Sequence, residues 1–351
     1  MQRAMALRLL RGKDGRLTAY APVAGGVARW TEERPGGPRW TGPRLLEVAG
    51  LTALTVTQGA DGYVHLVGLR HRQGGGDGPD VDVVHATQFQ TGRPLTAWHS
   101  LGTPHPKDRR KAQRTGAPAA AVDSSGAVHV FVRNAGRGVS ARRQDAKGKW
   151  GGWTDLKGTD VLDGLSATAA ADGRIELLAP AARGALRWHQ PEPGAAYQRA
   201  DDIPARPEAG SAAGVATGAG TVTHYWRDAV GLEVLAWRPG AGEPAPLGGE
   251  TGTGPVAVVR TTVDGHDCTV LAHRDAKSGR LAVAAHPTEH ETAGVWWTPS
   301  GEPGTSRPAL ALDGLGLVVL AALAPDDGLL VARQKTDEPG LALRAWGRVG
   351  E

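Results

Sequence analysis

The feature that most constrains this chain is a unit of about 50 residues that recurs seven times. The best-kept copy spans residues 117–158 and reads as four short strands separated by turns. Within it, Val128, Val130 and Val132 alternate with other residues, a period of two that predicts a strand and not a helix. One antiparallel sheet of four strands is too small to be stable alone, so each unit must pack on its neighbours.

The fourth strand aligns the units most clearly. Taking Trp153 as the reference, the equivalent residues recur at intervals of about 50 residues. They are Pro43, Trp98, Trp153, Ala200, Pro244, Trp297 and Trp346. The residue three positions later is apolar in six of the seven units, and the set is Leu46, Leu101, Leu156, Ile203, Leu247, Ser300 and Val349.

This repeat predicts an all-β fold, a seven-bladed β-propeller with four antiparallel strands per blade. We expect one domain over residues 1–351, with blades at approximately 5–50, 51–115, 116–162, 163–208, 209–251, 252–304 and 305–351. A turn, mostly Asp followed closely by Gly, comes after the first strand of the units because Asp caps such turns and Gly supplies a positive φ. Blade seven is expected to pack directly on blade one, without a shared closing strand.

The first strand of each unit is expected to line a central channel. These strands are rich in small residues, which suits the crowded axis, and they fall at residues 6–10, 53–57, 119–122, 166–170, 212–216, 256–260 and 309–312. Arg8 and Arg260 are the exceptions, so we expect them to face a wet channel or a counter-charge.

Composition agrees with this architecture and narrows the function. The 51 Gly and 24 Pro favour many tight turns. A net charge of +4 is too small for the concentrated basic face that a dedicated nucleic-acid binder requires. The short basic run at residues 107–114 is expected to be a solvated linker. The single Cys268 forms no internal disulfide.

The apolar run near the N-terminus is only about five residues long, so we expect neither a secretory segment nor a membrane span in the chain as it stands. We therefore expect a cytoplasmic location, or a secreted one if a signal peptide has been removed.

Two motifs of the third unit, Gly126-x-Val-His-Val-Phe-Val-Arg133 and Trp150-x-x-Trp153-x-x-Leu156, resemble those of the PLL-like bacterial lectins. The resemblance covers all seven units in outline and is strong in the third. It implies a seven-bladed propeller that binds fucose and similar saccharides at shallow sites between blades, with Trp rings stacking on the sugar. The chain departs from the pattern at Pro43, Ala200 and Pro244, which puts most of the seven possible sites in doubt.

The tryptophans are the candidate ligand contacts. The chain has 11 Trp against 4 Tyr and 2 Phe, and an indole offers a flat face to a sugar as well as an N–H donor. The same ring also fills the gap between blades, and this structural interpretation stays open for each of them. The candidates are Trp98, Trp150, Trp153, Trp297 and Trp346, with Trp150, beside two glycines, expected to be the most exposed.

No other motif predicts chemistry. His65, His129 and Glu176 occupy the same strand position in successive blades, but the blade radius keeps them too far apart to share a metal. The sequence His-x-x-Glu-His at 286–290 matches a zinc-protease motif that requires a helix, whereas Pro287 places it in a loop. Asp77, Asp80 and Asp82 lack the full pattern of a calcium loop. We expect no cofactor, no metal and no catalytic residue.

Three functions remain open at this point. The leading hypothesis is a non-catalytic module that binds a saccharide or another small ligand. The second is an enzyme with its site at one mouth of the channel, acting on a specialised metabolite or a saccharide. The third is a protein-interaction scaffold, since a protein partner is a common use of a propeller surface.

Overall fold

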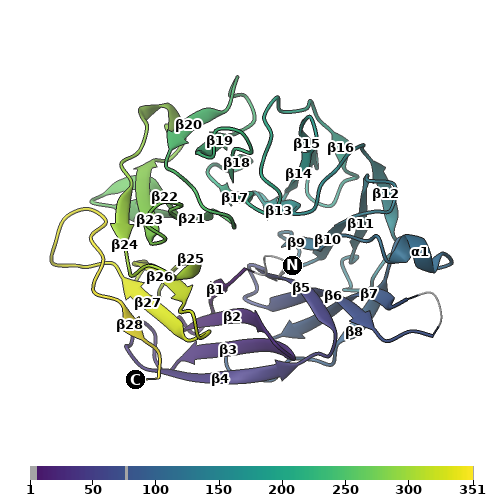
Figure 1. The fold of residues 1–351 in the computed structure, drawn as a ribbon, viewed down its shortest axis with the longest axis horizontal. Coiled ribbons are helices and arrows are strands. Elements are labelled where there is room, and N and C mark those ends of the chain that lie inside the picture. The colour runs from purple at the N-terminus through teal and green to yellow at the C-terminus, as the bar shows by residue number, and fades with distance from the viewer. Residues whose placement is uncertain (1–5, 76–77, 351) are drawn as a thin grey trace.

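The computed structural model describes residues 6–75 and 78–350, and its strands form seven four-stranded sheets arranged in a ring (Figure 1). Each sheet is an antiparallel meander built from one consecutive stretch of chain, so the expected seven-bladed β-propeller is confirmed. In the part of the chain described, no helix is both long and apolar enough to cross a membrane.

The first four blades contain strands β1 to β16. Their bounds are β1 Arg8–Arg11, β2 Leu17–Val23, β3 Gly26–Glu32, β4 Trp40–Glu47, β5 Leu51–Gln58, β6 Val64–Arg72, β7 Asp80–Gln88, β8 His99–Gly102, β9 Ala119–Val122, β10 Val128–Arg133, β11 Val139–Arg143, β12 Thr154–Lys157, β13 Ser166–Ala169, β14 Ile175–Ala181, β15 Gly184–His189 and β16 Gln198–Arg199.

The last three blades contain strands β17 to β28. Their bounds are β17 Ala213–Ala216, β18 Val222–Arg227, β19 Val234–Trp237, β20 Ala245–Gly248, β21 Ala257–Val263, β22 His266–Arg274, β23 Leu281–Pro287, β24 Thr298–Ser300, β25 Ser306–Leu312, β26 Val318–Leu323, β27 Leu329–Arg333 and β28 Gly347–Arg348. Two short helices interrupt the loops, α1 at Arg109–Ala112 and the 3₁₀ turn η1 at Glu291–Ala293.

The alternation seen in the third unit assigns the two faces of its sheet. Val128, Val130 and Val132 of β10 pack into an apolar cluster with blade two, whereas Phe131 packs into the cluster shared with blade four. Both faces of the strand are therefore buried, as a sheet between two other sheets requires. The period of two sorts the residues of β10 between two neighbours and not between core and solvent.

In several blades, a polar side chain at or just after the end of the third strand accepts a backbone hydrogen bond from the second strand of the same sheet. The amide oxygens of Gln144, Gln190 and Gln334 accept the N–H of the first residue of the second strand at 2.9 to 3.1 Å. In blade one, Glu32 makes the same contact with the N–H of Leu17 at 2.7 Å. This device recurs across the ring, and the sequence comparison of the units did not reveal it.

The ring closes by direct packing of blade seven on blade one. The side chains of both blades share one apolar cluster, and Arg11 donates to the carbonyl of Asp313 at 2.8 Å. The guanidinium of Arg333 donates to the buried carboxylate of Glu32 and lies 3.3 Å from the carboxylate of Asp313. As expected from the sequence, no strand is shared across the junction between these two blades.

Arg333→Ala is expected to lower the free energy of unfolding by about 3 to 5 kcal/mol, because it leaves the fully buried Glu32 without its counter-charge. Chemical denaturation followed by circular dichroism measures the change. Lys335→Ala, which breaks a more exposed pair with Glu338 in the same blade, is the control and should have little effect. Equal stability of the two variants would show that the ion pair does not hold the ring closed.

Candidate functional site

The tryptophans of the fourth strands join neighbouring blades. The indole N–H groups of Trp153 and Trp297 each donate at 2.9 Å to a backbone carbonyl in the preceding blade, Leu101 and Leu247 respectively. Trp346 donates at 3.0 Å to the hydroxyl of Ser300 in blade six. The acceptors lie at the position three residues after the reference position. At these three interfaces, the reference tryptophan of one blade therefore bonds to the residue three positions after the reference position of the preceding blade.

Trp98 and Trp150 are also half-buried at interfaces. Trp98 packs on the apolar cluster shared by blades one and two, and Trp150 packs on the cluster shared by blades two and three. The ring of Trp150 makes an edge contact with His85 at a centroid distance of 5.3 Å. Trp150 is thus less open than its flanking glycines indicated. None of the five candidate tryptophans is fully exposed, whereas Trp296 is 86% exposed.

A cavity of about 490 Å³ lies between blades two and three and is called here the blade 2–3 cavity. Its lining comes from four places: the connection around α1, the turn before β11, β11 itself, and the fourth strand of blade three with the residue just before it. The residues used below are His105, Arg114, Asn134, Ser140, Trp153 and Asp155. An aromatic ring, an amide, a carboxylate and a hydroxyl are the groups that proteins use to orient a polar ligand in a pocket.

The polar groups of the blade 2–3 cavity are held in place by their neighbours. Asn134 accepts the N–H groups of Gly136 and Gly138 at 2.9 and 3.0 Å, and its own amide N–H₂ donates to Ser140 at 3.2 Å. Its amide nitrogen also lies 3.4 Å from a carboxylate oxygen of Asp155. A hydrogen bond from Lys157 lowers the pKa of Asp155, so that this carboxylate is ionised at neutral pH.

His105 completes the cavity as a neutral imidazole. Its Nε2 accepts the N–H of Ala135 at 3.2 Å, which places the ring proton on Nδ1. Burial, and then the nearby charge of Lys111, lowers the pKa of His105. At neutral pH, the imidazole of His105 is therefore uncharged and can donate a hydrogen bond from Nδ1–H.

Two further cavities of about 530 Å³ each lie on the other side of blade three, against blade four. The first is called the rim cavity, and in it the guanidinium of Arg199 lies over the ring of Trp188 at 4.7 Å and covers one ring face. The second is called the turn cavity, and it contains Asp123, His129 and Trp150.

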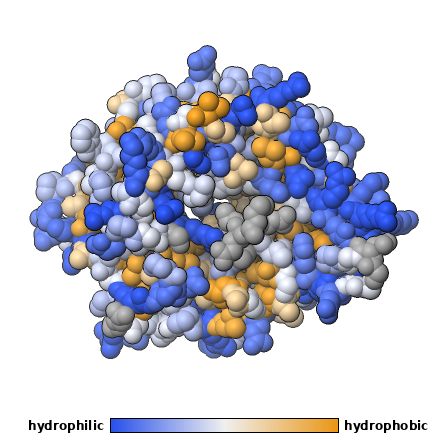
Figure 2. Space-filling view, in the orientation of Figure 1, coloured by the Kyte–Doolittle hydropathy of each residue, from blue (hydrophilic) through white to orange (hydrophobic). Residues whose placement is uncertain are grey.

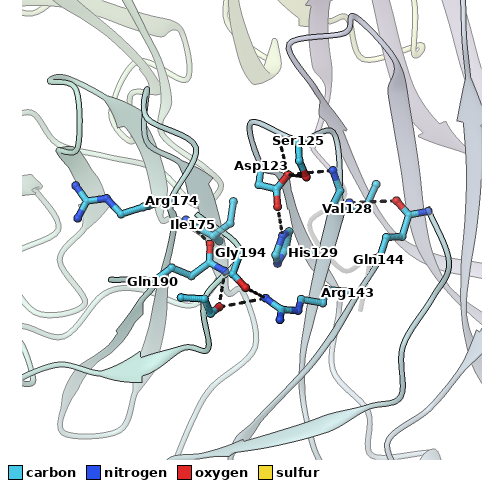
Figure 3. A network of polar contacts seen from close by, with 12 residues as sticks. Asp123, Ser125, Val128, His129, Arg143, Gln144, Arg174, Ile175, Gln190 and Gly194 are labelled. Atoms are coloured by element: carbon cyan, nitrogen blue, oxygen red, sulfur yellow. Dashed lines mark hydrogen bonds and ion pairs between the residues drawn. The ribbon is translucent and has the colours of Figure 1, made fainter. Parts of the chain in front are cut away.

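The polar groups beside the turn cavity are bonded to one another (Figure 3). The carboxylate of Asp123 accepts from His129 Nε2 at 2.9 Å and from two backbone N–H groups of its own turn. Burial alone would raise the pKa of Asp123, but these hydrogen bonds outweigh it and lower the pKa to about 2. The phenol of Tyr197 contacts the other ring nitrogen of His129, and Arg143 donates to the carbonyl of Gly194 at 2.6 Å. The bonds of Asp123 lie within blade three, whereas those of Tyr197 and Arg143 join blades three and four.

The three residues at the shared position of the second strands do not converge. His65 pairs with His85 at 3.1 Å, His129 with Asp123, and Glu176 with Arg187 at 3.3 Å. Among the described residues, no group of three His, Cys, Asp or Glu side chains has the geometry of a metal site. His286 lies on β23, one residue before its end at Pro287, and contacts the hydroxyl of Tyr225 at 3.2 Å, so the His-x-x-Glu-His sequence begins on a strand and continues in a loop.

The acidic residues of the blade-two insertion are neutralised by arginines. Asp82 pairs with Arg70 at 2.7 Å, and Asp80 pairs with Arg109 at 3.1 Å, while Asp77 lies outside the described residues. Arg109 begins α1, so the basic run is not only a solvated linker. It forms a helical turn whose first arginine also donates to the carbonyls of Gly75 and Gly78.

Arg8 and Arg260, the two arginines expected in the channel, lie in different surroundings. Arg8 lines the channel, whereas Arg260 is not among the residues that line it. Arg260 pairs with Asp267 on the adjacent strand at 2.7 Å, so that a counter-charge and not the channel takes its guanidinium.

Sequence reasoning found one residue of the blade 2–3 cavity, Trp153, and missed the polar ones. His105 lies in a connection between blades, and Asn134 and Asp155 belong to a turn and a strand edge that look like ordinary surface in the sequence. The available signal was their place in the third unit, the copy with the best-kept motifs. As ligand contacts, the five tryptophans stay predictions.

Neither a family model nor a curated protein matches this chain. Among solved structures, the BP39L lectin from Burkholderia pseudomallei is similar with a TM-score of 0.74 at 14% identity, over 99% of this chain and 99% of that one. AofleA from Arthrobotrys oligospora is similar with a TM-score of 0.53 at 9% identity, over 86% and 88% of the two chains.

The SapL1 lectin, solved with alpha methyl fucoside, is similar with a TM-score of 0.50 at 12% identity over 99% of this chain and 95% of that one. At these identities the similarities establish the fold. The expected resemblance to lectin propellers is therefore confirmed at the level of the fold.

Trp297→Phe is expected to lower the free energy of unfolding by about 1 to 3 kcal/mol, because the buried carbonyl of Leu247 loses the indole N–H. Trp296→Phe is the matched control, since the adjacent ring is 86% exposed and its loss should change stability little. Thermal unfolding of both variants measures the difference. Equal melting temperatures would contradict a structural role for the indole hydrogen bond.

Acid is expected to destabilise the interface of blades two and three through the His65–His85 pair. Burial lowers the pKa of His65 to about 4 and that of His85 to about 3. An unfolded histidine has a pKa near 6.5, so the unfolded state binds more protons and stability falls as the pH falls from about 6.5 towards 3. The melting temperature measured at intervals of pH should decrease over this range.

The double variant His65→Gln with His85→Gln replaces the pair with side chains that do not titrate and should flatten this pH dependence. His266→Gln removes an exposed histidine and serves as the control. A pH dependence equally steep in the double variant would show that other groups cause the acid sensitivity.

Proposed function

We propose that the protein is a non-catalytic, lectin-like propeller that binds a saccharide in the blade 2–3 cavity. The observation that carries the proposal is the combination, in one inter-blade cavity, of a fixed tryptophan ring with an amide, a carboxylate and a neutral imidazole. The volume of about 490 Å³ suits a monosaccharide or a short oligosaccharide.

Trp153 supplies a rigid apolar surface. The carbonyl of Leu101 accepts its indole N–H and also a guanidinium N–H of Arg142, so the ring is anchored to blade two at its polar edge. The C–H face of a pyranose ring packs on such a surface through apolar contact. Because the indole is already held in place, little side-chain entropy is lost when the ligand binds.

Asp155 and His105 supply an acceptor and a donor, while Asn134 holds Asp155 and Ser140 in position through its amide N–H₂. A sugar hydroxyl donates and accepts at once, so it pairs with a carboxylate oxygen and with an imidazole N–H. These groups are oriented by bonds to their neighbours, which makes the cavity selective for a ligand with hydroxyls at matching positions.

The other two cavities are weaker candidates on chemical grounds. Arg199 already covers one ring face of Trp188 in the rim cavity, and in the turn cavity Asp123 is fully engaged by His129 and its own turn. The similar lectin structures support a saccharide as the ligand class, since SapL1 was solved with alpha methyl fucoside.

The channel lends no support to the alternative of a channel-mouth enzyme. Among the described residues that line it there is no His, Asp or Glu, so the converging acid and base that such an enzyme requires are missing from that part of the chain. A protein-interaction scaffold stays a prediction that no feature above favours.

A glycan array followed by calorimetry tests the proposal, with alpha methyl fucoside as the first soluble probe. His105→Ala removes the imidazole N–H donor from the blade 2–3 cavity, so the affinity for the ligand that the wild type binds should fall about tenfold or more. Arg199→Gln alters the rim cavity and is the control, expected to bind as the wild type does.

Two results would overturn the proposal. The first is the absence of saturable binding of any saccharide at millimolar concentration by the folded wild type. The second is loss of binding in Arg199→Gln with full binding in His105→Ala, which would move the site to the interface of blades three and four.

A further inference from the structure

The described strands enclose a cavity, the central channel, at the axis of the ring and do not fill it with side chains. It has a volume of about 450 Å³, and a hollow is visible at the centre of the molecule when it is viewed along the axis (Figure 2). The first strands of the blades line it, because they are the innermost strands of their sheets (Figure 1). Most of the side chains they contribute are Ala, Val, Leu and Thr, which leave room at the axis.

Arg8 is the one charged residue among the described residues that line this channel. It lies on β1 between Leu7 and Leu9, whose side chains are buried, while its own is accessible from the channel. The alternation of the strand therefore turns the guanidinium towards the axis.

The guanidinium of Arg8 has no acidic partner in the described part of the chain. No Asp or Glu appears in the described lining, and no ion pair between described residues involves Arg8. Enclosure by the ring lowers the pKa of Arg8, and no neighbouring acid opposes that shift. An arginine stays charged at neutral pH, so the channel carries an uncompensated positive charge.

Arg260, by comparison, has an acidic partner. It lies on the equivalent strand of blade six, pairs with Asp267 through two hydrogen bonds of 2.9 and 2.7 Å, and that pairing raises its pKa. Arg8, unlike Arg260, is a partly enclosed charge without an acidic partner, which raises the free energy of the folded protein. An anionic ligand that bonds to the guanidinium would offset this cost.

Hydroxyl groups accompany Arg8 in the channel. Thr57, Ser166 and Thr168 lie among the lining residues and come from the first strands of blades two and four. A hydroxyl donates to an oxyanion, as a guanidinium does, and the guanidinium fork matches the two oxygens of a carboxylate or phosphate.

We propose that the central channel is a second binding site, separate from the blade 2–3 cavity, that takes a small molecule with a carboxylate or phosphate group on Arg8. The volume limits the ligand to the size of a small metabolite. The site does not depend on the saccharide proposal, because the two cavities share no lining residue.

Calorimetric titration with inorganic phosphate and, separately, with citrate tests this site at low ionic strength, where charge interactions are least screened. The wild type should bind one of these probes saturably with one site per chain. Arg8→Gln should weaken that binding at least tenfold, and Arg8→Lys, which keeps the charge but loses the fork, should weaken it by a smaller factor.

Arg260→Gln is the matched control, because it removes one positive charge from the same innermost layer of strands without touching the described channel lining. It should bind the anion as the wild type does. Without added anion, Arg8→Gln should melt at the same temperature as the wild type or higher, since no partner loses a contact.

The proposal is overturned if neither probe binds saturably to the folded wild type. It is equally overturned if Arg8→Gln and Arg260→Gln weaken binding to the same extent, which would assign the effect to net charge. Saccharide binding should be unchanged in Arg8→Gln, so failure of this inference and failure of the lectin proposal give different results.

Discussion

The packing of each four-stranded sheet against the next is the interaction on which the rest of this structure depends. A single blade leaves both faces apolar, so it is stable only between two others, and the ring removes the need for a free face. The apolar clusters accordingly run across blade boundaries, as they do between blades two and three and between blades seven and one. Tryptophan suits these boundaries because its ring fills the wide outer gap while its N–H bonds to the preceding blade.

The same packing decides where a ligand can bind. Where the side chains of two neighbouring sheets do not fill their interface, a cavity remains that is walled by rigid strands. Blade three has such cavities on both sides, and on the blade-two side the connection through α1 adds His105 to the wall. Polar groups placed there are held by strands and turns, which gives the blade 2–3 cavity a fixed geometry before any ligand arrives.

Sequence reasoning recovered the fold because the fold repeats. The turns after the first strands, the alternation in β10 and the fourth-strand register were all visible in the sequence, and the register marks in fact meet as hydrogen bonds between Trp153 and Leu101. A local pattern cannot show which neighbour a side chain meets. A counter-charge for Arg260 was one of two expected outcomes, but its identity as Asp267 and the contact of Trp150 with His85 were not predicted.

Much of the site was unpredictable for the same physical reason. His105 lies in the connection through α1, whereas Asn134 and Asp155 lie in a turn and a strand of blade three, and only the fold of blade three and its packing against that connection bring them to one cavity. The contribution of α1 was also missed, because a single helical turn held by Asp108 and by contacts to a neighbouring loop has no periodicity to detect.

The central claim is that an interface between blades forms a saccharide site, and a crystal structure of the protein with its tightest-binding saccharide tests it most directly. The account predicts density for a sugar ring against Trp153 in the blade 2–3 cavity, with hydroxyls bonded to Asp155 and His105. A sugar bound at another interface or in the channel, with the blade 2–3 cavity empty, would contradict it.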